Sequence, residues 1–449
     1  MAKPYPSYKP SGVPWLGNIP SHWAIGRLKF SATSRASNVD KHIKDDELPV
    51  ELCNYVDVYN NDFITSELTF MKASATEPEI ERFEIKKGDV LITKDSESWD
   101  DIAVPAMVAE DLGGVLCGYH LAIIRSLPGK FHAGYLFRLF CSEMLNYQFK
   151  IEANGVTRFG LPTAAIDNAL LLRPPLPEQE LISEYIDRET ARIDALIDKK
   201  RRLLELLEEK RLAVITHAVT KGLDPNAPMK DSGIDWLGQI PAHWGLKRLK
   251  FTGQLYDCKH VTPTYTNDGY PLVSTGEIKP FTISFSSARL VSEDDFVNMT
   301  EGGRLPVRGD IIYSRNASIG SAARVTDQPP FCMGQDICLV RPSDFRSDFL
   351  EFALNSKAVL GQIDSMTVGS TFRRINVDRI RNYWLPQPPH NEQKMIVEYL
   401  EQFGARLHRI VGAITSAIEH LTEYRSALIT NAVTGKIDVR GEVAKEAAA

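Results

Sequence analysis

The chain has 449 residues, of which 43% are hydrophobic and 24% charged, and its formal net charge is −6. This length favours two to four domains, and the composition is typical of a soluble globular protein. The acidic balance argues against a protein that coats nucleic acid without specificity, although a local basic patch is enough for DNA binding.

Neither a membrane segment nor a disulfide framework is indicated. No apolar run approaches the ~18–20 residues that cross a bilayer, and the N-terminus lacks the apolar core of a secretory signal. The six cysteines are scattered and form no C-x-x-C pair, which is typical of reduced thiols rather than of disulfides or a zinc site. We therefore expect a cytoplasmic protein with no metal site and no membrane partner.

The head motif WLGNIPSHWAIGRLKF begins at Trp15 and recurs as WLGQIPAHWGLKRLKF at Trp236. Matching segments follow in the same order, including KGDV and RGDI, PPLPEQ and PPHNEQ, and ITHAVTKG and ITNAVTGK. The chain thus contains two copies of one unit, each with a head motif, a body and a long terminal segment. Two copies are too few for a solenoid but fit an internal pseudo-dyad.

The two bodies, 31–173 and 252–387, contain short runs rich in Val and Ile that are broken by Gly, Pro, Asn and Asp. The runs DVLITK and LAIIRS in the first body, and DIIYSR and ICLVRP in the second, predict strands. The stretches 133–151 and 347–363 have the apolar spacing of helices. We expect an α+β fold with two pseudo-dyad-related globular α/β domains.

The terminal segments, 174–221 and 388–436, predict two long helices that Gly222 and Gly435 end. Apolar residues recur there at alternating steps of four and three, as in a coiled-coil seam. The predicted seam comprises Ile182, Ile186, Ile193, Leu196, Leu203, Leu207, Ile396, Leu400, Phe403, Leu407, Ile410, Ile414, Leu421 and Leu428. Antiparallel pairing of the two helices is favoured, because a dyad reverses one against the other; packing of each helix on its own body is the alternative. The remaining divisions are the first head at 1–30, a linker with the second head at 222–251 and a tail at 437–449.

No familiar catalytic motif is present: the sequence lacks a P-loop, a G-x-G-x-x-G loop after a strand, H-E-x-x-H and G-x-S-x-G. Glu79, Glu84 and Lys86 are loosely spaced like a metal-dependent nuclease signature, but a surface charge run explains them better. His22 and His243 in the head motifs are expected to be packed and hydrogen-bonded rather than catalytic.

Candidate binding residues lie in loops that follow predicted strands, where recognition usually sits. Arg and Lys can read guanine edges and Asn can read adenine. The candidate DNA-contacting residues are Lys94, Ser96, Arg158, Arg315, Asn316, Arg373 and Arg374. Each of them taken singly also fits an ordinary solvated surface group, and equivalent placement in both bodies is what favours a binding role.

The duplicated heads, the K/R-G-D strands, the P-P-L-P-E-Q and P-P-H-N-E-Q leads and the I-T-x-A-V-T helix ends span nearly the whole chain. Together they resemble the specificity subunit of type I restriction–modification systems. The resemblance implies two target recognition domains, each binding one half of a split double-stranded DNA sequence. It also implies an antiparallel coiled coil that sets the spacer and docks two modification subunits.

By the same resemblance, catalysis belongs to other chains. The modification subunits would carry S-adenosylmethionine and methylate adenine, and restriction subunits would join to cut, so this chain needs no cofactor. A related single-complex (type IIB-like) restriction enzyme uses a similar specificity chain and stays open as an alternative. So do a coiled-coil protein scaffold without DNA binding and a nuclease built on Glu84 and Lys86.

Overall fold

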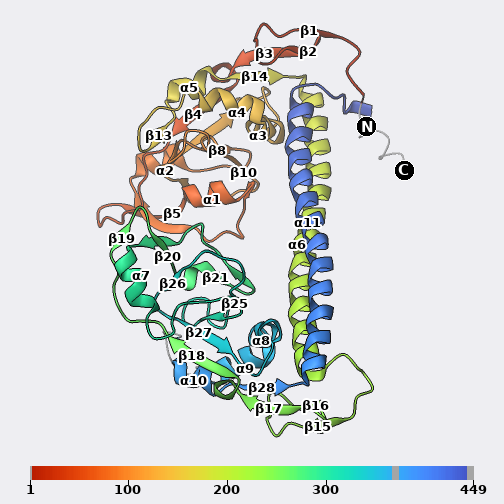
Figure 1. The fold of residues 1–449 in the computed structure, drawn as a ribbon. Helices are drawn as coiled ribbons and strands as arrows, with labels where there is room; N and C mark the ends of the chain where they lie inside the picture. The colour runs from red at the N-terminus through yellow and green to blue at the C-terminus, as the bar shows by residue number, and fades with distance from the viewer. Residues whose placement is uncertain (1–2, 367–373, 442–449) are drawn as a thin grey trace. The chain divides into compact units, whose positions relative to one another are not determined.

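The computed structural model describes residues 3–366 and 374–441, with side chains described except at 364–366. The chain forms two compact units: unit 1 comprises 1–200 and 416–449, and unit 2 comprises 201–415. Two long helices, α6 (Leu176–Lys221) and α11 (His390–Val433), are shared between the units (Figure 1). Unit 1 contains the start of α6 and the end of α11, and unit 2 contains the end of α6 and the start of α11. No helix in the described ranges is both long and apolar enough to span a membrane.

The body of unit 1 is built on a five-stranded sheet of order β4-β12-β8-β10-β6 and a three-stranded sheet of order β11-β5-β7. The elements before α6 are β1 (Tyr8–Pro10), β2 (Asn18–Pro20), β3 (Ala24–Arg27), η1 (Leu28–Phe30), β4 (Ala32–Ala36), β5 (Leu48–Cys53), α1 (Tyr55–Asn60), β6 (Phe63–Ile64), β7 (Met71–Ala75), α2 (Glu77–Phe83), β8 (Val90–Thr93), β9 (Asp95–Ser96), β10 (Pro105–Val108), β11 (Val115–Cys117), β12 (Leu121–Ser126), α3 (Ala133–Cys141), α4 (Glu143–Lys150), β13 (Phe159–Gly160), α5 (Thr163–Asn168) and β14 (Leu170–Arg173).

The body of unit 2 is built on two four-stranded sheets, of order β18-β27-β24-β25 and β19-β23-β20-β26. Its elements before α11 are β15 (Met229–Asp231), β16 (Gln239–Pro241), β17 (Gly245–Arg248), η2 (Leu249–Phe251), β18 (Gly253–Asp257), β19 (Tyr265–Thr266), β20 (Tyr270–Val273), η3 (Thr275–Glu277), β21 (Ile278–Lys279), β22 (Thr282–Ile283), β23 (Arg289–Val291), α7 (Glu293–Thr300), β24 (Ile311–Ser314), β25 (Ala322–Arg324), β26 (Cys332–Met333), β27 (Ile337–Pro342), α8 (Ser347–Leu354), α9 (Lys357–Met366), α10 (Val377–Arg381) and β28 (Trp384–Gln387).

The central strands confirm the α+β prediction. β8 lies between β12 and β10, and β24 lies in the same way between β27 and β25. Val90, Leu91 and Ile92 are fully buried, as expected for a strand covered on both faces. The four predicted strand runs are therefore confirmed as the middle of the main sheet in each body.

The K/R-G-D motif before each central strand is explained by one buried aspartate. In unit 1, Asp89 accepts from the guanidinium of Arg125 at 2.7 Å and from the backbone N–H of Lys86 at 2.8 Å. In unit 2, Asp310 accepts in the same way from Arg341 at 2.9 Å and from the Val307 N–H at 2.9 Å. A buried carboxylate needs such partners, so the motif and the distant arginine recur together.

The two predicted helical stretches are each divided in two. The stretch 133–151 breaks at Ser142 into α3 and α4, and 347–363 breaks before Ser356 into α8 and α9. Both serines are buried, and Ser356 donates from Oγ to the Ala353 carbonyl at 2.6 Å. Serine side chains compete with the helix backbone for hydrogen bonds, which apolar spacing alone does not reveal.

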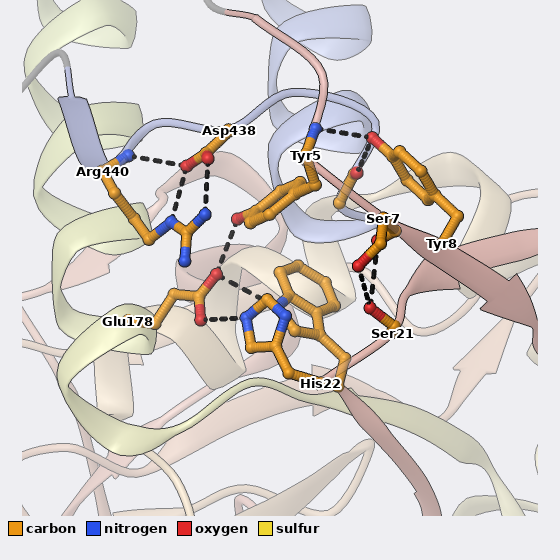
Figure 2. Close-up of polar contacts among 10 residues, drawn as sticks. Tyr5, Ser7, Tyr8, Ser21, His22, Glu178, Asp438 and Arg440 are labelled. Carbon is orange, nitrogen blue, oxygen red and sulfur yellow. Dashed lines mark hydrogen bonds and ion pairs between the residues drawn. The ribbon is translucent and has the colours of Figure 1, made fainter.

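Each head motif is tied to the first turn of a long helix by a carboxylate. Glu178 of α6 accepts from Trp23 Nε1 at 3.1 Å and from Tyr5 Oη at 2.7 Å, and it lies 2.7 Å from His22 Nε2 (Figure 2). Burial and the neighbouring carboxylate raise the pKa of Tyr5 well above its ordinary value, so the phenol stays a donor. The expectation that His22 is hydrogen-bonded is confirmed, but its side chain is 39% exposed rather than packed in the interior.

The second head repeats this joint on α11. Trp244 Nε1 donates to Glu392 at 2.9 Å, and His243 Nε2 lies 2.6 Å from the same carboxylate. Acidic side chains are favoured in a first helical turn because they face the positive end of the helix dipole. The paired W…HW motifs are therefore structural joints in both units.

The predicted helix ends at Gly222 and Gly435 are confirmed, since both glycines have positive φ, at 77° and 71°. A Cβ at Gly435 would lie 3.1 Å from the Trp23 ring, and one at Gly222 would lie 3.2 Å from Trp244. Each head tryptophan thus packs beneath the end of one long helix while it bonds to the start of the other, so the two helices run antiparallel within each unit.

The predicted seam residues are buried near the head motifs, but several of them are exposed near the middle of the long helices. The buried members are Ile182, Ile186, Ile193, Ile396, Leu400, Leu407, Ile414 and Leu428, and the half-buried ones are Leu207, Phe403 and Leu421. Leu196, Leu203 and Ile410 are exposed instead, so the prediction is wrong for these three. A strict 3.5-residue seam drifts by about 20° per heptad on a straight helix, and the buried face passes to Ile197.

Candidate nucleic-acid interface

Three chain segments converge beyond the end of the central strand in each body. In unit 1, the N–H of Lys94, which follows β8, donates to the His120 carbonyl at 2.9 Å, and the Leu161 N–H donates to the Lys94 carbonyl at 2.8 Å. In unit 2, the N–H of Arg315, which follows β24, donates to the Asp336 carbonyl at 2.8 Å. The Ile375 N–H then donates to the Arg315 carbonyl at 3.0 Å. We call these convergence points reading site 1 and reading site 2.

Reading site 1 is centred on His120. Its Nδ1 lies 2.9 Å from an Asp95 carboxylate oxygen. Nη2 of Arg158 lies 3.3 Å from Nε2 and 3.4 Å from Nδ1 of the same ring, so it contacts both ring nitrogens. Lys94 lies over the Tyr119 ring, with Nζ 4.9 Å from the ring centroid. The site therefore offers an exposed cation, a ring and a polarised imidazole.

Reading site 2 uses the same positions with other chemistry. Asp336 occupies the place of His120 and accepts from Asn316 Nδ2 at 3.0 Å. Nε of Arg374 lies 2.6 Å from the other Asp336 oxygen, and the Arg374 side chain is 53% exposed. Ala317 and Asp336 have positive φ, at 53° and 63°, which is uncommon for residues other than glycine and marks stored backbone strain.

Two predicted DNA-contacting residues are not on the surface. Arg315 is 3% exposed, with Nη2 2.7 Å from Asp257 Oδ1 and 3.7 Å from Cys258 Sγ. Ser96 is buried in β9, which pairs with β13, and its Oγ accepts from the Ser98 N–H at 3.2 Å. The pairing of β9 with β13 holds Ser96 in the interior, and the ion pair with Asp257 holds Arg315 there. Both residues therefore stabilise the loops of the reading sites.

The other predicted residues lie at the two sites or outside the described residues. Lys94 is partly covered, Arg158 and Arg374 are exposed, and Asn316 is half-buried. Arg373 lies outside the described ranges. Sequence reasoning missed Asp95, Tyr119, His120 and Asp336. Their position in the sequence could have identified His120 and Asp336, because they directly precede the equivalent strand runs LAIIR and ICLVR.

A cavity of about 330 Å³ adjoins reading site 1. Its walls include the rings of His42, Tyr55, Tyr119 and His120. Aromatic walls suit planar ligands such as nucleobases, which stack on rings.

Asp257, Cys258 and His260 bring potential metal ligands within 4.8 Å of one another. One Asp257 oxygen is already paired with the Arg315 guanidinium, and burial raises the pKa of the Cys258 thiol. A metal would meet a fixed positive charge and a protonated thiol there, so this cluster fits a structural ion pair better than a cation site.

Glu79 and Glu84, the carboxylates of the nuclease-like signature, have local structural partners. Glu79 accepts from the N–H and the hydroxyl of Thr76, forming the capping box of α2. Glu84 accepts from the Gly114 N–H at 3.3 Å. These contacts account for both side chains without a catalytic metal.

Comparison with known proteins agrees with this architecture. Residues 263–420 match the family model described as type I restriction modification DNA specificity domain. The chain is 21% identical over 443 residues to the EcoKI specificity subunit of Escherichia coli, covering 94% of this chain and 90% of that one. The chain is therefore similar to type I restriction enzyme specificity subunits over most of its length. A second relative, the putative MjaX specificity subunit of Methanocaldococcus jannaschii, is 20% identical, with 95% of this chain and 96% of that one covered.

Solved structures of specificity subunits share the fold. The HsdS subunit from Thermoanaerobacter tengcongensis superposes with a TM-score of 0.51 at 19% identity, covering 93% of this chain and 98% of that one. A chain from a structure on complex assembly and conformational transition of the type I R-M system gives a TM-score of 0.63 at 18% identity. That match covers 93% of this chain and 99% of the solved chain.

Proposed function

We propose that this chain is a type I specificity subunit with two target recognition domains, 31–173 and 252–387, each of which reads one half of a bipartite site in double-stranded DNA. The observation that carries this proposal is the pair of reading sites, which have one backbone arrangement and different side chains. Side chains that contact base edges determine sequence preference. Two sites with different side chains are therefore expected to prefer two different half-sequences.

The paired helices α6 and α11 set the distance between the half-sites and dock two modification subunits in this proposal. Those subunits bind S-adenosylmethionine and methylate adenine, and restriction subunits complete the complex. The specificity subunit itself is non-catalytic, and its contribution is recognition and assembly. The chemical groups at the reading sites support this division, because Asp95 is engaged by His120, and Asp336 is engaged by Asn316 and Arg374.

Exchange of one body for that of a relative tests the proposal. A chimera in which residues 252–387 come from a relative with a different recognition sequence is produced with the modification subunits. Sequencing of methylated DNA should show that one half of the motif changes while the other half and the spacer stay the same. Change in both halves, or in neither, would contradict the assignment of one half-site to each body.

A further inference from the structure

The heads carry an exposed basic–aromatic patch that recurs in both units. In unit 1, η1 buries Leu28 and leaves Lys29 and Phe30 exposed; Phe30 is 64% exposed. In unit 2, η2 buries Leu249 and leaves Lys250 and Phe251 exposed; Phe251 is 60% exposed. Single exposed apolar residues are common on protein surfaces, but an exposed phenylalanine kept at the equivalent position of both copies is not explained by folding.

The geometry of the patch is duplicated along with its sequence. Lys29 Nζ lies 5.5 Å from the centroid of the Phe30 ring, and Lys250 Nζ lies 5.1 Å from that of Phe251. A second basic residue stands beside each pair. Arg27 donates to Asn168 Oδ1 at 3.4 Å, and Arg248 donates to the matching amide of Asn382 at 2.7 Å. Each patch is thus a phenyl ring with a lysine ammonium beside it, and an arginine stands two positions before the lysine; the Arg248 guanidinium lies 4.8 Å from the Trp384 ring centroid.

The patches lie at the opposite end of the sheet from the reading sites. β4 begins at Ala32, directly after the patch, and pairs with β12 so that Ala32 faces Ser126 and Ala36 faces Ala122. Reading site 1 lies beyond the other end of β12, at His120. With a rise of about 3.3 Å per residue, roughly 13 Å of strand separates the two ends. The register of β18 with β27 gives unit 2 the same arrangement, with Gly253 opposite Pro342 and Asp257 opposite Cys338.

We propose that the Lys29–Phe30 and Lys250–Phe251 patches are equivalent docking points for two copies of one protein partner, the modification subunit, through carboxylates that surround an apolar pocket. This inference rests on the proposed function and adds a contact on the heads to the expected contact on the helices. The reading sites differ because the half-sites differ, whereas a partner present twice needs the same surface twice. Phenylalanine and arginine are enriched in the cores of protein interfaces, and the neighbouring lysines and arginines favour an acidic counterpart.

The test uses the full chain produced with its modification subunit, with the number of bound subunits counted by native mass spectrometry. Phe30→Ala and Phe251→Ala should each weaken one of the two binding events about tenfold or more, so that complexes with one modification subunit accumulate. The double variant should lose both. Tyr147→Ala is the matched control, because Tyr147 is another exposed aromatic residue of unit 1 outside the patch, and it should bind two subunits like the parent.

Two further measurements separate this inference from its rivals. The double variant should melt like the parent, and its binding to DNA in the absence of modification subunits should be unchanged. Full retention of two modification subunits at parental affinity would overturn the docking assignment alone. Loss of DNA affinity in the isolated double variant would also overturn it, in favour of a phosphate-binding patch. A parent chain that binds no modification subunit would overturn the proposed function as well.

Discussion

The two reading sites share one set of backbone contacts and differ in nearly every side chain placed on it. Position 95 is aspartate and its counterpart 316 is asparagine; position 120 is histidine and its counterpart 336 is aspartate. In both sites these two side chains contact each other, at 2.9 Å and 3.0 Å, and an arginine from a third segment joins them. The difference shows that one backbone arrangement holds two sets of side chains: strands and backbone hydrogen bonds fix the loops, and the side chains on them vary.

The comparison extends to Lys94 and Arg315, which hold equivalent positions and differ in burial. Arg315→Ala should destabilise unit 2 by about 3 kcal/mol, because Asp257 loses its partner and a buried side chain is removed. Lys94→Ala should change stability by less than about 1 kcal/mol, since its ion pair with Asp95 is long, at 3.7 Å, and partly exposed. Thermal melting of the two variants beside the parent checks this contrast, and equal shifts would contradict it.

The two head joints give a smaller contrast. Glu178 contacts three side chains, Tyr5, His22 and Trp23, whereas Glu392 contacts His243 and Trp244. Glu178→Ala should therefore cost about 2 kcal/mol of stability and Glu392→Ala about 1 kcal/mol, because bonds to a more buried carboxylate are harder to replace with water. Urea denaturation of both variants measures the difference. A larger loss from Glu392→Ala would show that the Tyr5 contact adds no stability.

The exposed arginines test the reading sites directly. Arg158→Ala and Arg374→Ala should each reduce affinity for the parental DNA sequence about tenfold, the order expected for one base-contacting arginine. The reduction should disappear on DNA in which only the half-site of the altered unit is scrambled. Fluorescence anisotropy at fixed salt measures these affinities, since phosphate contacts make binding salt-dependent. An equal loss on every DNA would identify the arginine as a phosphate contact instead.

Much of the architecture was predictable because local sequence patterns determine the strands and helix ends, and because these patterns occur twice in the chain. The strand runs at β8, β12, β24 and β27, the glycine stops of both long helices and the hydrogen bonds of the head histidines are confirmed. The helix breaks were not predictable, because they depend on buried hydroxyl contacts: Ser142 bonds to the Thr430 hydroxyl, and Ser356 bonds to the Ala353 carbonyl. The exposure of Leu196, Leu203 and Ile410 follows from helical drift over many turns, which a heptad pattern does not record.

The reading sites were predictable in position more than in composition. The loops after the central strands are where the chain segments converge, and Arg158 and Arg374 lie at the convergence points. Arg315 was assigned to the surface because arginine usually lies there, and only the fold brings Asp257 close enough to bury it. His120 and Asp336 were missed because each stands just before an apolar strand run and differs between the two copies. Contacts between segments far apart in sequence decide all three cases.

The most direct test of the central claim is a chain in which residues 252–387 are replaced by a second copy of residues 31–173. With two identical bodies, the complex formed with the modification subunits should methylate a motif made of two copies of the first half-site in inverted orientation. Sequencing of methylated DNA reads this motif directly. Methylation of the parental asymmetric motif by the duplicated chain would contradict the account, because the second half would then be read without the second body.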